Sequence, residues 1–259
     1  MPLGRQAHDP LTNTEETKTM SVLQAIFRPL RAPLRQWRLT LRHAEQLTPR
    51  MRRLQFTSPD LHQMQWSPGQ DLVLNLPDAP RRHYTIRALR DDVLTIDFVM
   101  HGHGAAAQWA QRAQPGNQLD AAGPRGRTRL SETADWHLFV GDETCIPAIF
   151  AMLETLPARK RAWAFIEIES DAERQSLTTH GDVHIEWIAR NGPARPSALL
   201  LERLKAFEMP PGTGHAYTLG ETSGVRAERH WLIDRGWSRE QITSEGYWRP
   251  GRIGGHDHA

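Results

Sequence analysis

The sequence predicts a two-domain protein of the β plus α/β class, in which a β-barrel precedes an α/β domain of nucleotide-binding type. Residues 35–122 contain short β-rich segments separated by Pro and Gly turns, whereas the chain after 131 alternates between strand, loop and helix. The length of 259 residues leaves room for two domains that each bury their own core. We expect the hinge near 125–135.

The first half of the chain holds five segments with the alternation or composition of strands. In the last of them, alternate apolar residues from Leu94 to Met100 share one face, which we expect to face the core. A short helix is expected at 104–113, ended by a Pro-Gly pair. The predicted strands are 37–43, 51–56, 71–76, 83–89 and 93–100.

The second half follows the strand, loop and helix rhythm of a parallel sheet. A short apolar run at 136–141 predicts a buried strand, and the apolar segment 146–156 predicts the helix that follows it. Gly236 stands where a helix over 223–236 would need its C′ glycine. The remaining predictions are strands at 162–169, 183–189 and 215–220 and a helix at 197–207.

The charged residues nearly balance, with 32 basic against 30 acidic side chains and a formal net charge of +2. Only three of the basic residues are lysines, so 29 are arginines. This balance disfavours a basic nucleic-acid coat, and we expect no nucleic-acid partner. The positions of individual arginines, which are planar and permanently charged, therefore matter more than their total.

The single cysteine, Cys145, excludes an intramolecular disulfide framework, a four-cysteine zinc site and a cysteine-ligated iron–sulfur cluster. We interpret it as a small packed hydrophobe in a cytoplasmic protein. No window approaches the roughly 18 apolar residues of a membrane span, so no membrane insertion is expected. The first 20 residues lack the apolar stretch of a signal peptide. Residues 1–33 are expected to be a disordered or loosely ordered tail, because the segment is rich in Thr and Glu and has little to bury.

Two loops follow predicted strands of the α/β half and begin with glycine, namely 141–144 and 220–224. In an open parallel sheet, ligands collect at the carboxyl ends of strands, where helix N-termini present free N–H groups. These loops could therefore bind a ribose or a phosphate, or they could be ordinary turns capped by Thr144 and Ser223. No G-x-G-x-x-G and no Walker A lysine motif is present.

A sharper pattern is Arg82-His83-Tyr84-Thr85 inside a predicted barrel strand. The set suits a flavin dinucleotide, since it offers a planar cation for a pyrophosphate, an aromatic ring for stacking and a hydroxyl. The alternative is an edge strand with a solvent-facing arginine and a half-buried tyrosine. Four residues alone leave both interpretations open.

Six motifs in order along residues 34–251 resemble the siderophore-interacting protein family, which comprises FAD-containing ferric-siderophore reductases on a ferredoxin-reductase-like plan. They are RRHYTIR (81–87), HGHGAAAQWA (101–110), AQPGNQLDAAGPRG (113–126), GDETCIPAI (141–149), GETSGVRAERHWL (220–232) and GYWRPG (246–251). The resemblance implies a Greek-key FAD-binding β-barrel at 34–130 and a Rossmann-like NAD(P)H-binding α/β domain at 131–259.

The resemblance also implies residue roles. Arg82 would bind the FAD pyrophosphate, Tyr84 would stack on the flavin ring, and Thr85 would lie near its N5 edge, so Tyr84 and Thr85 are the candidate catalytic residues. Where relatives usually carry Pro-Ala-Ser, this chain has Ala105-Ala106-Ala107, which removes a side-chain hydroxyl. The implied cofactor-binding residues are Arg82, His83, Tyr84, Thr85, His101, Gly102, Gly104, Ala105, Ala106, Ala107, Asp142, Glu143, Thr144, Glu221, Arg226 and Trp248.

The implied substrate is a ferric siderophore, a frequently anionic complex whose hard oxygen ligands suit Fe(III) far better than Fe(II). Reduction of the iron would therefore release it, and the protein needs only a basic mouth near the flavin. The predicted substrate-binding residues are Arg52, Arg125 and Arg249, and we expect no metal ligated by the protein. Trp248 could shield the flavin or simply pack the last strand.

The function predicted is that of an NAD(P)H-dependent, FAD-containing ferric-siderophore reductase acting in the cytoplasm as a monomer. A general NAD(P)H:flavin oxidoreductase and a siderophore-binding module without turnover are the alternatives. The choice between NADH and NADPH stays open. Acidic residues near the end of the second α/β strand (Glu167, Glu169 and Asp171) favour a ribose hydroxyl, whereas Arg190 or Arg195 could meet a 2′-phosphate.

Overall fold

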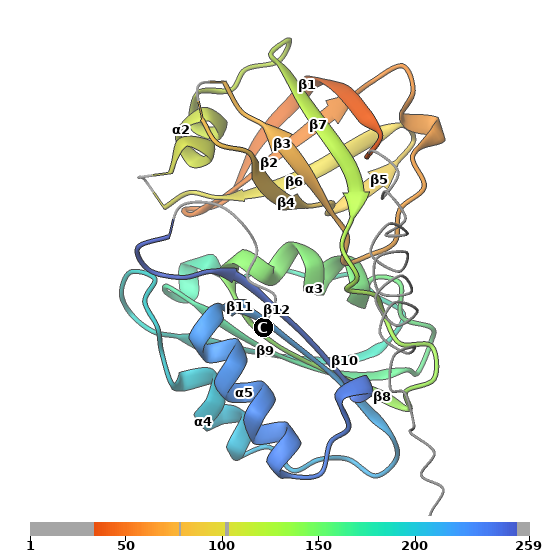
Figure 1. Cartoon of the computed structure of the whole chain (residues 1–259), viewed down its shortest axis with the longest axis vertical. Coiled ribbons are helices and arrows are strands. Elements are labelled where there is room, and N and C mark those ends of the chain that lie inside the picture. Colours follow the sequence, from red (N-terminus) through yellow and green to blue (C-terminus); the bar gives the residue numbers. More distant parts are fainter. Residues whose placement is uncertain (1–33, 78, 102–103, 253–259) are drawn as a thin grey trace, which may run out of the picture. The chain divides into compact units, whose positions relative to one another are not determined.

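The computed structural model describes residues 34–77, 79–101 and 104–252. The predicted tail at 1–33 lies outside these ranges, so its order stays a prediction. Within them the chain forms a seven-stranded antiparallel sheet and a five-stranded parallel sheet that carries helices (Figure 1). The predicted class, a β-barrel followed by a Rossmann-like α/β domain, is confirmed.

The antiparallel sheet closes into a barrel because one segment of chain pairs with both of its edges. The strands are β1 (Gln36–Thr48), β2 (Met51–Thr57), β3 (Asp71–Asn75), β4 (Arg82–Thr85), β5 (Ala88–Arg90), β6 (Val93–Val99) and β7 (Gln118–Arg125), paired in the order β4-β3-β7-β1-β2-β6-β5. Strand β4 pairs with β3, and β5, only two residues further on, pairs with β6. The single strand predicted at 83–89 is therefore two strands, since the chain changes its partner at 86–87.

The barrel core is built by alternation along its strands. Leu94, Ile96 and Phe98 on β6 are fully buried, as predicted, and Met100 packs against the same core. Helix α2 (Ala105–Arg112) adds Ala106 and Ala110 to this cluster.

Strand β7 was not predicted, although it lies between β1 and β3. Its sequence, QLDAAGPR, contains none of the β-branched or aromatic residues that favour strands. Its place comes from pairing with both neighbours, for example Leu39 with Leu119 and Val73 with Ala122. The connection from β6 back to β1 and β3 gives the barrel its Greek-key topology.

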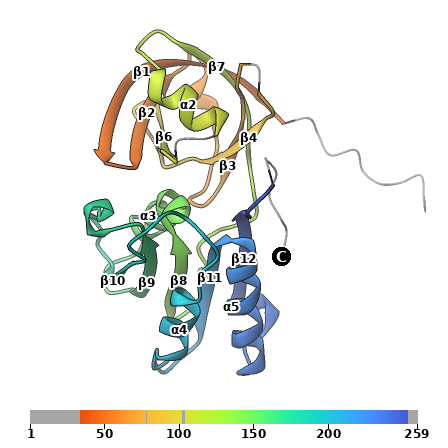
Figure 2. The same ribbon diagram turned by 90° about the vertical axis from the view of Figure 1, so that its left-hand side faces the viewer.

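The α/β domain has a parallel sheet in the order β10-β9-β8-β11-β12. Its elements are β8 (Trp136–Asp142), α3 (Ile146–Leu153), β9 (Arg161–Ile168), β10 (Asp182–Ala189), α4 (Leu199–Lys205), β11 (Gly214–Glu221), α5 (Thr222–Asp234) and β12 (Ile242–Trp248). Helix α3 covers one face of the sheet, and α4 and α5 cover the other (Figure 2). Gly236 follows α5 with φ +89°, as predicted for a C′ glycine.

Burial on both faces explains why β8 reads as a continuous apolar run. Phe139 packs in the cluster that contains α3, whereas Leu138 and Val140 pack with the buried leucines of α4 and α5. The chain runs from β8 outward through β9 to β10 and then returns on the other side of β8 as β11. The carboxyl ends of β8 and β11 therefore form the topological switch point at which open sheets bind ligands.

The barrel also contacts the α/β domain through side-chain packing and an ion pair. Met51 and Val99 of the barrel pack in the same apolar cluster as α3. Arg87, which is buried, donates from Nη1 to Glu154 Oε2 at 3.0 Å. These contacts join β2, β6 and the link between β4 and β5 to the domain that carries the switch point.

Candidate functional site

A cavity of about 740 Å³ collects residues from β4, the start of α2, the loops after β8 and β10, and the segment that follows β12. Cofactor and ligand sites usually have volumes of roughly 300–1,000 Å³. The predicted site residues that line it are Arg82, His83, Tyr84, Thr85, His101, Gly104, Ala106, Glu143, Thr144, Trp248 and Arg249. A second hollow, of about 850 Å³, lies beside Arg42 and Arg90, and none of the predicted residues lines it.

The remaining predicted residues do not line this cavity. Gly102 lies outside the described residues, as does His103. Ala107 is fully buried in the barrel, so this position does not reach the cavity even through its methyl group. The others that lie off the cavity wall are Arg52, Ala105, Arg125, Asp142, Glu221 and Arg226.

Strand β4 places Tyr84 at the cavity, where its ring packs against Phe98. The ring centroid lies 4.2 Å from that of Phe98 in the barrel core. Burial raises the pKa of Tyr84, and the opposing charge of Arg82 does not cancel this. Arg82 itself donates from Nη1 to the carbonyl oxygens of Pro80 and Arg81, at 3.0 and 3.1 Å. A neutral aromatic ring and a nearby guanidinium therefore share one wall.

Thr85 is buried and forms a hydrogen bond with the side chain of Tyr247 on β12. Burial is the main cause that raises the pKa of Tyr247, so this phenol is neutral. Tyr247 also lines the cavity. It was missed in the sequence, although it stands beside Trp248 in the GYWRPG motif. The bond ties the strand of the barrel to the last strand of the α/β domain.

His83 belongs to a polar network that lies beside the cavity and includes Arg125. His83 Nδ1 lies 2.6 Å from Asp71 Oδ2, and Arg125 Nη1 lies 3.2 Å from His83 Nε2. Arg125 Nη1 also lies 3.0 Å from His83 Nδ1, and Arg125 Nε lies 3.9 Å from Asp71 Oδ1, so the three side chains form one cluster. Arg125 therefore orients His83.

Helix α2 begins at the cavity, and its N-cap residue makes no side-chain cap hydrogen bond. Gly104 is the N-cap residue, its backbone is extended, and no side chain bonds to the first N–H groups. Gly104 and Ala106 both line the cavity. An added Cβ at Gly104 would lie 2.5 Å from His101 Cε1, so a side chain at this position would have to displace the His101 ring.

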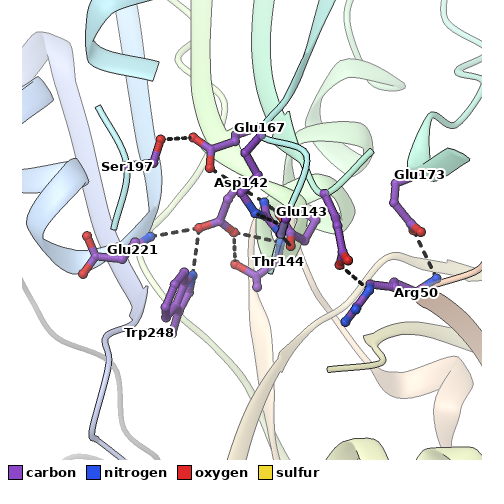
Figure 3. Close-up of polar contacts among 12 residues, drawn as sticks. Arg50, Asp142, Glu143, Thr144, Glu167, Glu173, Ser197, Glu221 and Trp248 are labelled. Carbon is purple, nitrogen blue, oxygen red and sulfur yellow. Dashed lines mark hydrogen bonds and ion pairs between the residues drawn. The ribbon is translucent and has the colours of Figure 1, made fainter. Parts of the chain in front are cut away.

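Asp142, at the end of β8, ties three segments together (Figure 3). Its carboxylate accepts from Thr144 N at 2.9 Å, from Glu221 N at 3.0 Å and from Trp248 Nε1 at 2.8 Å. Burial, with the nearby charge of Glu143, raises the pKa of Asp142 to about 6. Asp142 thus fixes the indole of Trp248, which lines the cavity, and acts from behind the wall.

Glu143 and Arg190 form a buried ion pair on the cavity wall. Arg190 Nη1 donates to Glu143 Oε2 at 2.6 Å, and the side chains are 2% and 9% exposed. Burial opposes the charge of Arg190, but its hydrogen bonds and ion pair with Glu143 outweigh burial and raise its pKa. Glu167 lies 3.7 Å from the same guanidinium and accepts from Ser197 Oγ at 2.8 Å.

The second predicted loop lies behind the wall as well. Glu221 caps α5 by accepting from Ser223 N at 3.0 Å and from Gly224 N at 2.9 Å. Arg226 is exposed on α5 and lines none of the described cavities. Glu221 therefore has a structural part in this loop, because its carboxylate caps the N-terminus of α5.

Among the predicted substrate arginines, Arg249 lines the cavity and Arg52 does not. Arg52 Nη2 lies 3.4 Å from the carbonyl oxygen of Ala113 near the end of α2. Arg50, two residues earlier, lines the cavity instead, because it lies in the turn between β1 and β2. Arg50 therefore lines the cavity in the place predicted for Arg52.

The described residues contain no helix long and apolar enough to cross a membrane. Within the same ranges no three His, Cys, Asp or Glu side chains cluster so as to hold a metal ion.

Comparison with known proteins places the chain among relatives of known family. Residues 75–128 match the siderophore-interacting FAD-binding domain, and residues 134–251 match the siderophore-interacting protein family. The crystal structure of a siderophore utilization protein from T. fusca superimposes with a TM-score of 0.81 at 30% identity, covering 88% of this chain and 97% of that one.

The chain belongs to the siderophore-interacting protein family.

Two curated relatives of this siderophore-interacting protein carry functional names. A ferric vibriobactin reductase of Vibrio cholerae is 33% identical over 177 residues, which cover 66% of this chain. The match spans 65% of the length of that relative. An NADPH-dependent ferric-chelate reductase of Escherichia coli is 29% identical over 205 residues, covering 76% of this chain and 78% of that protein.

The residues present at the cavity fit FAD, the cofactor named by the matched domain. An uncapped helix start at Gly104 and the guanidinium of Arg82 line one cavity, and together they can hold a pyrophosphate. Tyr84, backed by Phe98, offers a rigid apolar ring for a planar ligand. The predicted cofactor FAD is thus confirmed for this siderophore-interacting protein, while the role of each residue stays a prediction.

Proposed function

We propose that this protein is an NAD(P)H-dependent, FAD-containing reductase that releases iron from ferric siderophores by reducing Fe(III) to Fe(II). The observation that carries the proposal is one cavity that combines the flavin-type residues of β4 and α2 with Arg50 and Arg249. A cofactor site alone would support a general flavin reductase equally well. The added arginines supply a place for an anionic iron complex beside it.

Bound FAD would supply the redox chemistry, which is acceptance of a hydride from the reduced nicotinamide and transfer of single electrons to iron. The chain positions the reactants and shapes the field around them. Arg82 and the N–H groups at the start of α2 hold the pyrophosphate, and Tyr84 supports the ring system. Thr85, fixed by Tyr247, places a hydroxyl on the same wall.

The electrostatics of the cavity support an anionic substrate. Five arginines line it against three carboxylates; buried Arg190 and Glu143 neutralise each other, and Asp97 is nearly inaccessible, which leaves four arginines and Glu169. The side chain of Asp97 is 1% exposed, and its carboxylate accepts two hydrogen bonds from Arg53, at 2.7 and 2.8 Å. Glu143 forms its ion pair with Arg190. We propose Arg50 and Arg249 as the substrate-binding residues, with Arg50 in place of Arg52, and Arg125 as the residue that orients His83.

We further propose NADPH as the preferred donor. In nucleotide-binding α/β folds, an acidic residue after the second strand binds a ribose 2′-hydroxyl, or a nearby arginine meets a 2′-phosphate. Glu167 already accepts from Ser197 and is 4% exposed, and Arg190 is held by Glu143. Arg195, in the loop after β10, is exposed and lies close enough to Glu167 to lower its pKa, although burial is the larger effect and raises it.

The remaining assignments concern the setting of the reaction. We propose domain boundaries at 34–130 for the FAD-binding barrel and 131–259 for the NAD(P)H-binding domain. A cytoplasmic monomer fits a protein with one buried free cysteine, Cys145, whose thiol has a pKa raised by burial.

The test begins with the purified full-length chain and its flavin absorption band. NADPH is then added without oxygen, together with a ferric siderophore and a chelator that colours with Fe(II). We expect flavin bleaching followed by Fe(II) formation. Arg249→Ala should raise the KM for the ferric siderophore, and more at low than at high salt, whereas Arg226→Ala, an exposed arginine off the cavity, should not.

Three outcomes distinguish the alternatives. A protein that is colourless and cannot be reconstituted with FAD contradicts the enzyme proposal. Bleaching without Fe(II) indicates the general NAD(P)H:flavin oxidoreductase. Binding of a ferric siderophore without bleaching by either NADH or NADPH indicates the siderophore-binding module.

A further inference from the structure

Of the three carboxylates that line the cavity, Glu169 differs from the other two in its exposure. Its side chain is 22% exposed, against 9% for Glu143 and 1% for Asp97. Glu143 is also paired with a buried arginine and Asp97 with a half-buried one. Glu169 is therefore the most exposed of the three carboxylates among the described cavity residues.

The partner of Glu169 is Arg50, which lines the same cavity. The carboxylate of Glu169 forms an ion pair with Nε of Arg50, whose side chain is 38% exposed. Arg50 belongs to the turn between β1 and β2 of the barrel, whereas Glu169 follows β9 of the α/β domain. The pair thus joins the two domains at the cavity wall, and Figure 3 shows Arg50 and Glu173 at this junction.

The turn that carries Arg50 has a second, independent anchor. Glu173 Oε2 accepts from Thr48 Oγ1 at 2.5 Å and from Arg50 N at 3.1 Å, and Glu173 is buried and does not line the cavity. The backbone of Arg50 is therefore held in place without Glu169. The charge of Glu169 then acts mainly on what approaches the guanidinium.

We infer that Glu169 is a specificity-determining residue that limits the negative charge of the ferric complex accepted beside Arg50. This inference rests on the proposed function and deepens it: the arginines bind an anionic ferric complex, and Glu169 weakens the binding of a trianionic tris-catecholate more than that of a complex with less negative charge. A carboxylate repels an anionic ligand in proportion to the charge of that ligand. It leaves the binding of an uncharged complex almost unchanged.

The size of the effect follows from Coulomb's law. One charge at roughly 8 Å from a trianion, at an effective dielectric constant of about 40 to 80 and physiological salt, gives a change in affinity of about three- to tenfold. The same change for an uncharged complex is within about twofold. The ratio of the two affinities is therefore the quantity to measure.

The test uses gallium(III) complexes, which bind like ferric ones but are not reduced in the assay. Dissociation constants for a gallium tris-catecholate and a gallium trihydroxamate are measured with the oxidised, FAD-loaded protein by quenching of tryptophan fluorescence. In Glu169→Gln the amide oxygen can still accept from Arg50, so the contact stays while the charge is lost. The matched control is Glu173→Gln, which removes a carboxylate charge that contacts the same turn but lies outside the cavity, and whose amide oxygen can still accept from Thr48 and Arg50.

We expect Glu169→Gln to tighten the tris-catecholate by about three- to tenfold, to leave the trihydroxamate unchanged, and to lose this difference at high salt. The control should leave the ratio as in the wild type. An unchanged ratio in Glu169→Gln, with both complexes bound by the wild type, overturns the inference and leaves the proposed function standing. A wild-type protein that binds neither complex contradicts the proposed function itself.

Discussion

The buried pair of Glu143 and Arg190 offers the sharpest perturbation of the cavity wall, through Glu143→Gln. The substitution keeps the shape of the side chain and one accepting oxygen but leaves Arg190, whose side chain is 2% exposed, without its main counter-charge. Breaking a buried pair by removing one partner costs about 3–5 kcal/mol. Glu167 lies 3.7 Å from the same guanidinium and offsets part of this, so we expect a loss of about 2–3 kcal/mol.

The assay is urea unfolding at neutral pH, followed by circular dichroism, with the slope of the transition fitted for each variant. In thermal unfolding of the same variants, the melting temperature should fall by about 4–12 °C, since a loss of 1 kcal/mol corresponds to roughly 2–4 °C for a chain of this size. A double variant, Glu143→Gln with Arg190→Met, should recover most of the loss because no buried charge is left unpaired. A loss below about 0.5 kcal/mol in the single variant would refute the reasoning.

Three further predictions address stability, FAD and the donor. The pKa of His137 is lowered to about 4 by burial, aided by Lys160 and His215. The unfolded chain, with a pKa near 6.5, therefore binds this proton first, and stability falls as pH drops from about 6.5 to 4. Unfolding of His137→Phe should show a smaller fall than the wild type over this window, and an equal fall would contradict the assignment. Tyr84→Ala should weaken FAD binding by about tenfold in a titration of the apoprotein, whereas Tyr84→Phe should keep it. Arg195→Ser should weaken NADP⁺ by about tenfold and leave NAD⁺ unchanged in equilibrium binding; equal weakening of both would place the 2′-phosphate elsewhere.

Most of the fold can be predicted from the sequence because many of its strands and helices show a regular pattern of apolar residues. The alternation from Leu94 to Met100 and the apolar run at 136–141 identified a barrel strand and the central parallel strand. Strand β7 escaped prediction because its position depends on pairing with β1 and β3 rather than on its own residues. The segment 83–89 read as one strand because its composition is continuous, whereas the backbone bonds of Ile86 and Arg87 go to different strands.

The site was predicted as a set of motifs but not as a geometry. The residues of β4 reach the cavity together because they are neighbours on one strand. Asp142 and Glu221 lie behind the wall, and the carboxylate of each accepts hydrogen bonds from backbone N–H groups of the surrounding loops. The choice of Arg50 over Arg52 depends on where the turn after β1 ends, which no pattern of basic residues reveals.

The central claim is that one chain binds FAD and couples NADPH oxidation to the release of Fe(II). The most direct measurement is the yield of chelated Fe(II) per NADPH consumed by the FAD-loaded protein, without oxygen and with a ferric siderophore in excess. We predict about two Fe(II) per NADPH, because a hydride carries two electrons and each iron takes one. NADPH consumption without Fe(II), or no consumption by a protein that has bound FAD, would contradict the claim.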